Sequence, residues 1–178
     1  MELKPNTKLS ISDFVKFLYP FAKESENKTG INAIVILSQA ALESGWNSSS
    51  PGWMYFGVKD TDGINGNEQL LVTTEYSRRY DLKFPEILSI TPVIIKGQKY
   101  FKYRVKDYFR KYNSPEECFT DHAKFFLRNP RYKKALEVRN NPYQFITEIA
   151  RAGYATDPEY ANKLISIANR IEKVLNHS

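Results

Sequence analysis

A long apolar segment without charge constrains this chain more than any other feature. No Asp, Glu, Lys or Arg occurs between Lys28 and Glu43, and the residues of 31–42 are typical of a buried or half-buried helix. Gly45 follows where a helix would end in a left-handed cap. The sequence therefore predicts a helix over 31–44 that carries one carboxylate, Glu43, in its last turn.

The position of Glu43 indicates an unusual carboxylic acid. The negative end of the helix dipole, partial burial and the nearby indole of Trp46 all disfavour the ionised form, so we expect a raised pKa. A general acid that works near neutral pH needs such a pKa. An ordinary surface glutamate in a last helical turn is the alternative, and the local pattern alone does not separate the two.

Length and charge limit the classes of protein to consider. With 178 residues, of which 42% are hydrophobic, the chain suffices for a single compact domain over 1–178. Its formal charge of +6 indicates affinity for polyanions, which include nucleic acid, anionic lipid and the anionic polymers of a bacterial wall. No continuous basic stripe on a helix and no DNA-reading motif is apparent, so nucleic acid is not expected as a partner.

Cysteine and histidine are too scarce to indicate a cofactor. Cys118 stands alone, which excludes an intramolecular disulfide and favours a buried thiol. His122 and His177 are too scattered for a zinc site, and the Asp- and Asn-rich stretch 60–66 does not match a calcium-loop register, so no metal is expected.

No segment reaches the about eighteen apolar residues that a membrane span requires, and 1–5 lacks the apolar core of a signal peptide. We therefore expect no membrane span, and the sequence leaves the route of any export open.

Local patterns predict helices at both ends of the chain and strands in the middle. Strand-like runs stand at 69–76, 87–95 and 98–105, with Lys96 and Gly97 as a hairpin turn. Caps and prolines delimit the helices, and Pro20 marks a kink or break in the first of them. The result is an α+β arrangement with helices expected over 12–26, 31–44, 115–128, 142–152 and 158–175.

Several blocks of residues follow one another in an order that carries a resemblance. They are SQAALESGW (38–46), YFGVK (55–59), TTEY (73–76), YFRKY (108–112), DHA with NPRY (121–132), AGYATDP (152–158) and YANKL (160–164). Together they resemble the glucosaminidase domains of glycoside hydrolase family 73, which include flagellar peptidoglycan hydrolases and bacterial autolysins. The likeness extends from about Phe14 to Leu175, and the 152–158 block is its most specific part.

This resemblance implies a fold and an activity. The fold is lysozyme-like, with a mainly helical lobe and a small antiparallel β lobe that flank a cleft. The activity is that of an endo-β-N-acetylglucosaminidase, which cleaves the β-1,4 bond after N-acetylglucosamine in peptidoglycan glycan strands. Such an enzyme acts on the bacterial cell wall, in the periplasm or outside the cell, and here it is expected to be a monomer without a cofactor.

The resemblance also implies roles for three residues. Glu43 matches the family's general acid, and Glu75 matches the position proposed for a second carboxylate, as base or electrostatic stabiliser. Tyr154 matches a tyrosine of the catalytic centre, and Gly153 before it is expected to cap the preceding helix. A solvent-facing strand glutamate and a packing tyrosine are the alternatives for Glu75 and Tyr154.

Aromatic residues near Glu43 are candidates for stacking on sugar rings. Trp46 and Phe56 are expected to line the cleft, with Trp53 and Tyr55 as weaker candidates, because some aromatic side chains must belong to the core. The chain departs from the family in a longer segment before Tyr108, which predicts a β-hairpin insertion at about 85–106. It also lacks the tryptophan that relatives often carry shortly before the second carboxylate, where this chain has the residues of 63–66.

Two other activities stay open at this point. A lytic transglycosylase would use a single acid and release products that end in an anhydro sugar. A non-catalytic peptidoglycan-binding module would keep the fold without turnover, but the presence of Glu43, Glu75 and Tyr154 together argues against it.

Overall fold

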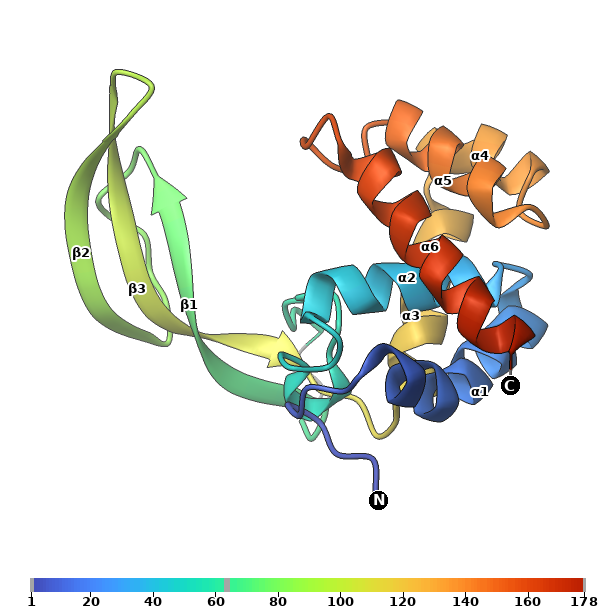
Figure 1. The fold of residues 1–178 in the computed structure, drawn as a ribbon. Helices are drawn as coiled ribbons and strands as arrows, with labels where there is room; N and C mark the ends of the chain where they lie inside the picture. Colours follow the sequence, from blue (N-terminus) through green and yellow to red (C-terminus); the bar gives the residue numbers. More distant parts are fainter. Residues whose placement is uncertain (1, 63–64, 178) are drawn as a thin grey trace. The chain divides into compact units, whose positions relative to one another are not determined.

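The computed structural model describes residues 2–62 and 65–177, and its chain divides into two compact units (Figure 1). One unit, here the helical unit, combines the residues up to Phe56 with those from Tyr112 onward. The other, here the sheet unit, is Gly57–Lys111. The α+β class predicted from the sequence is thus confirmed, with the strands in one continuous stretch of chain between helical segments. The single domain predicted over 1–178 and the insertion at about 85–106 stay predictions.

The helical unit is built from α-helices joined by short connections. None of the helices in the described residues is both long and apolar enough to cross a membrane. In chain order they are α1 (Ile11–Thr29), α2 (Ala33–Ser44), η1 (Pro51–Trp53), α3 (Pro115–Arg128), η2 (Pro130–Tyr132), α4 (Lys133–Glu137), α5 (Pro142–Arg151) and α6 (Tyr160–Asn176), where η marks 3₁₀-helices.

Helix α2 is the core of this unit, as the uncharged segment predicted. Nine of its twelve residues are buried, and it contacts α1, α3, α5 and α6. Figure 1 shows it in cyan among these helices. A helix that is apolar on all sides gains its stability from burial on all sides. The last turn of α2, where Glu43 lies, therefore belongs to a helix that other helices surround.

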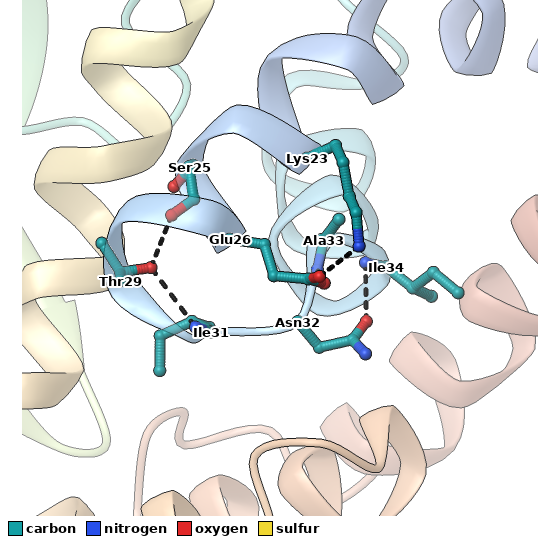
Figure 2. A network of polar contacts seen from close by, with 8 residues as sticks. All are labelled: Lys23, Ser25, Glu26, Thr29, Ile31, Asn32, Ala33 and Ile34. Atoms are coloured by element: carbon teal, nitrogen blue, oxygen red, sulfur yellow. Dashed lines mark hydrogen bonds and ion pairs between the residues drawn. The ribbon is translucent and has the colours of Figure 1, made fainter.

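A set of polar contacts fixes the point where α2 begins (Figure 2). The carboxylate of Glu26 in α1 accepts a hydrogen bond of 2.7 Å from the backbone N–H of Ala33, and it also pairs with Lys23. Asn32 is the N-cap, and its side-chain oxygen accepts a bond of 2.8 Å from the N–H of Ile34. These acceptors satisfy N–H groups that have no partner within the helix, and they tie α2 to α1.

Several helix boundaries differ from the sequence prediction, since α1 ends at Thr29 rather than at 26 and α2 begins at Ala33 rather than at 31. Helix α1 continues through Pro20, so the break allowed there does not occur. The buried face of α1, which includes Phe14 and Leu18, compensates for the hydrogen bond that proline removes. Helix α6 begins at Tyr160 rather than at 158, because the Asp157 side chain accepts the N–H of Glu159 and forms a separate turn first.

The sheet unit is a three-stranded antiparallel sheet. Its strands are β1 (Glu68–Ser77), β2 (Glu86–Ile95) and β3 (Gln98–Arg110), in the spatial order β1-β3-β2. The hairpin turn predicted between β2 and β3 is confirmed, since Lys96 and Gly97 both have positive φ angles, of 49° and 75°. Strand β3 is longer than predicted, because it extends to Arg110. It pairs with β1 along one edge and with β2 along the other.

The two faces of this sheet differ in chemistry. Side chains alternate along β3, so its odd- and even-numbered residues lie on opposite faces. The face with Tyr103 and Val105, here the covered face, is buried, and the rings of Tyr80 and Phe84 from the β1–β2 connection pack against it. The other face, here the open face, carries Tyr100, Lys102, Arg104, Lys106 and Tyr108 on β3.

Candidate active site

Glu43 lies in the last turn of α2, as predicted. Gly45 ends the helix with a φ of 58°, and the N–H of Trp46 donates to the carbonyl of Ala41 at 3.0 Å, which completes a Schellman cap. The Glu43 side chain is exposed, yet its surroundings still remove enough water to raise the pKa of its carboxyl group. The predicted direction of the pKa shift is thus found, and desolvation is its cause.

Tyr154 also follows a glycine that caps a helix. Gly153 has a φ of 84°, and the N–H of Tyr154 donates to the carbonyl of Ile149 at 3.0 Å after the last turn of α5. The cap expected at Gly153 is therefore confirmed. The pKa of the Tyr154 phenol is raised by burial first, then by Tyr160 and by the charge of Glu43. The charge of Glu43 therefore disfavours ionisation of the Tyr154 phenol.

Aromatic rings surround Tyr154 on the inside of the unit. Its ring centroid lies 5.4 Å from that of Tyr160, 5.6 Å from that of Phe126 and 6.2 Å from that of His122. Rings packed at such distances leave little room for water behind the phenol. The hydroxyl of Tyr154 therefore stays protonated, as the raised pKa requires.

A buried polar network lies behind Glu43 and Tyr154. The side-chain amide of Gln39 donates to the Tyr160 hydroxyl at 3.0 Å, and its oxygen faces Nε2 of His122 at 2.9 Å. Because the amide oxygen must accept, Nε2 of His122 carries the proton. Burial lowers the pKa of His122 to about 3, so this imidazole is neutral at physiological pH.

The roles of Gln39, His122 and Tyr160 were missed by the sequence analysis. Gln39 lies one helical turn before Glu43, so the two residues share a face of α2. The local signal for this network was the side-chain amide of Gln39 within a helix of mostly apolar residues. A fully buried amide needs hydrogen-bond partners. Those partners come from α3 and α6, which no local pattern connects to α2.

The four aromatic candidates near Glu43 have different surroundings. Phe56 is half-buried and stacks on His122, with ring centroids 3.7 Å apart, and half-buried Trp46 packs edge-on against Phe14 at 5.2 Å. Trp53 is half-buried in η1. Tyr55 is only 3% exposed, and its hydroxyl donates to the Asn47 side chain at 2.5 Å. The expectation that Tyr55 stacks on sugar is therefore wrong: its ring belongs to the core.

Glu75 lies in the sheet unit, on β1. It is paired in register with Tyr103, so it projects from the covered face. Lys59 places its ammonium group 2.8 Å from the Glu75 carboxylate and 3.3 Å from that of Asp107. Desolvation lowers the pKa of Lys59, but the hydrogen bonds to these two carboxylates outweigh it and the pKa is raised. Glu75 is therefore an ion-paired carboxylate rather than a merely solvated one.

This architecture is that of the lysozyme-like glycoside hydrolases. Within that class the chain belongs to the glucosaminidase family, glycoside hydrolase family 73, because residues 19–173 match the family's profile, described as mannosyl-glycoprotein endo-β-N-acetylglucosaminidase.

Relatives agree with this assignment. The chain is 32% identical to the peptidoglycan hydrolase FlgJ of Pseudomonas aeruginosa over 92% of its own length and 37% of that protein, and 27% identical to the exo-glucosaminidase LytG of Bacillus subtilis over 89% and 51%. A glycoside hydrolase domain of Salmonella typhimurium FlgJ superposes with a TM-score of 0.67 at 32% identity, covering 92% of this chain and 99% of that domain. The chain thus spans less than half the length of the FlgJ proteins that it matches.

Proposed function

We propose that this chain hydrolyses bacterial peptidoglycan as an endo-β-N-acetylglucosaminidase, cleaving the β-1,4 bond after N-acetylglucosamine. Family membership supports the reaction type, and the names of FlgJ and LytG support peptidoglycan as the substrate. The observation that carries the proposal is the family match over residues 19–173, and the position of Glu43 in the last turn of α2, with a pKa raised by desolvation, fits a general acid. The site of action is then the cell wall, in the periplasm or outside the cell, and the protein acts as a monomer.

In this mechanism Glu43 is the general acid. Its carboxyl group donates a proton to the glycosidic oxygen as the bond to the anomeric carbon breaks, and positive charge develops on the sugar ring. A carboxylic acid with a raised pKa keeps its proton closer to neutral pH than an ordinary glutamate does. Tyr154, which stays neutral, orients the N-acetyl group or stabilises the transition state through its hydroxyl.

The second step requires a nucleophile on the opposite side of the sugar. Either Glu75 activates water as a base, or the substrate's own acetamido oxygen attacks while Glu75 stabilises the positive charge. In both routes Lys59 is the ion-pair partner of Glu75. Trp46, Phe56 and Trp53, which keep part of their surface exposed, are the proposed sugar contacts.

The test is mass spectrometry of the soluble fragments that the wild type and Glu43→Gln release from purified peptidoglycan. We expect fragments with reducing-end N-acetylglucosamine from the wild type and a rate at least about 100-fold lower from the variant, the usual contribution of a general acid. Glu137→Gln, an exposed glutamate in α4, is the matched control and should keep full activity.

Other outcomes would replace the proposal. Fragments that end in anhydro-muramic acid would indicate a lytic transglycosylase, because hydrolysis adds a water that transglycosylation does not. Folded protein that binds peptidoglycan from several sources and releases nothing would indicate a binding module.

A further inference from the structure

The open face of the sheet unit combines exposed cations with exposed tyrosines. Lys102 and Arg104 lie next to each other on this face of the central strand β3. Tyr76 of β1 is paired in register with Lys102, and Tyr108 lies further along β3. Tyr76 is 54% exposed and Tyr108 is 44% exposed. Exposed apolar and aromatic surface that gathers on one face is typical of a binding site.

Only some of the cations of this face are neutralised by carboxylates. Arg104 donates to the neutral Thr74 hydroxyl at 2.8 Å, and within residues 2–62 and 65–177 neither Lys102 nor Arg104 has a carboxylate partner. Lys106 pairs with Glu86 at 3.2 Å, at the edge of the face. The sheet unit as a whole contains eleven Lys and Arg against seven Asp and Glu, so it carries +4 of the chain's +6. This excess of positive charge favours an anion as a partner of this face.

The mixture of rings and cations narrows the kind of anion. A phosphate polymer without rings would use Lys102 and Arg104 but not the tyrosines. A glycan strand that carries carboxylates would use both, because sugars stack on aromatic faces and carboxylates pair with guanidinium and ammonium groups. The stem peptides of peptidoglycan supply such carboxylates. Single-stranded nucleic acid also combines rings with charge and is kept as an outcome of the test.

We propose that the open face binds a segment of peptidoglycan, with Lys102 and Arg104 on stem-peptide carboxylates and Tyr76 and Tyr108 against sugar rings. This inference rests on the proposed function for the identity of the polymer. Glu75 projects from the opposite, covered face of the same sheet. The open face is therefore a separate contact from the one that Glu75 makes, and it holds the enzyme on polymeric wall rather than taking part in bond cleavage.

A second contact of this kind raises the affinity for a polymer that can reach both places and leaves short substrates unaffected. The variant that tests it is Lys102→Gln with Arg104→Gln. The matched control is Lys83→Gln with Lys99→Gln, which removes the same charge from exposed positions of the same unit outside the open face. Binding is measured by co-sedimentation with insoluble peptidoglycan in the Glu43→Gln background, so that the polymer is not digested.

We expect the open-face variant to bind intact peptidoglycan about tenfold more weakly, which corresponds to about 1.4 kcal/mol, while the control stays within about twofold. On insoluble chitin, a neutral glycan without muramic acid or stem peptides, the two variants should bind alike. With Glu43 restored, both should cleave a short soluble glycan at the wild-type rate.

Three results would overturn the inference. The first is equal binding of both variants to intact peptidoglycan. The second is a difference that disappears once wall phosphate polymers are removed by hydrofluoric acid. The third is tighter binding of single-stranded DNA than of peptidoglycan, with the same loss in the open-face variant. Failure of the wild type to cleave the short glycan would instead count against the proposed function, so the two failures are distinguishable.

Discussion

At the scale of single residues, the raised pKa of Glu43 makes the free energy of unfolding depend on pH. Because the folded-state pKa of Glu43 is raised by desolvation, the native state binds more protons than the unfolded state between the two pKa values. Stability therefore falls as pH rises through that window, and above it the ionised carboxylate destabilises the fold. Below the unfolded value of about 4.3, both states are protonated and the effect is absent.

We expect Glu43→Gln to raise the free energy of unfolding at pH 7.5 and to leave it unchanged at pH 3.5. Urea denaturation at the two pH values measures this, with Glu137→Gln as the control for loss of an exposed carboxylate. An equal gain in the free energy of unfolding at both pH values would mean that ionisation of the Glu43 carboxylate does not destabilise the fold. A stabilising substitution that removes activity would be typical of a functional site.

Loss of the buried Gln39 amide should lower the free energy of unfolding by more than the size of the side chain suggests. Gln39→Leu leaves the Tyr160 hydroxyl and Nε2 of His122 without their partners, so we expect a cost of about 1–3 kcal/mol in unfolding free energy and a lower kcat. In a Tyr160→Phe background part of that cost should disappear, because one orphaned group is gone. A double-mutant cycle measures the coupling, and strict additivity would argue against the network.

At the scale of elements, the N-terminus of α2 is the most informative place to perturb. Asn32→Ala removes the cap that accepts the N–H of Ile34 and should cost about 1 kcal/mol. Glu26 still holds the N–H of Ala33, so the helix should persist and activity well below the melting temperature should be kept. Denaturant unfolding measures the cost, and Asn140→Ala, at an exposed position, is the control.

The elements that could be predicted from the sequence are those with a local cause. The apolar run produced α2. The Ser114 side chain caps α3 by accepting the N–H of Glu117. The positive φ angles of Lys96 and Gly97 form the hairpin turn. At Pro20 the sequence predicted a kink or a break, and α1 has no break there, because burial of one face of α1 is a tertiary effect that no local pattern contains. Helix α4 has five residues, too few for a period to be recognised.

The same division applies to the site. The positions of Glu43 and Tyr154 at helix ends follow from Gly45 and Gly153, whereas the role expected for Tyr154 came from the family resemblance. The network of Gln39, His122 and Tyr160 joins residues up to 121 positions apart, and it exists only once three helices have packed. Tyr55 shows the opposite error, since an aromatic residue beside a predicted acid was assigned to a binding surface although the core required it.

At the scale of the whole molecule, the single thiol offers a probe of unfolding. Cys118 is 1% exposed, and burial raises its pKa to about 12, so both access and reactivity are suppressed in the folded state. We expect no reaction with a thiol reagent under native conditions and full reaction in denaturant. The midpoint of labelling should coincide with that of the loss of helical circular dichroism, and earlier labelling would indicate that α3 opens locally first.

The way the chain joins its two units affects how such a protein can change over generations. The sheet unit is one uninterrupted stretch of chain. Where the chain re-enters the helical unit, the N–H of Tyr112 donates a hydrogen bond of 2.9 Å to the carbonyl of Gly52 in the same unit. Recombination that exchanged this stretch would leave the two cut ends already adjacent. A lineage can therefore acquire a new strand lobe in one genetic event while it inherits the acid-bearing helix and its packing intact.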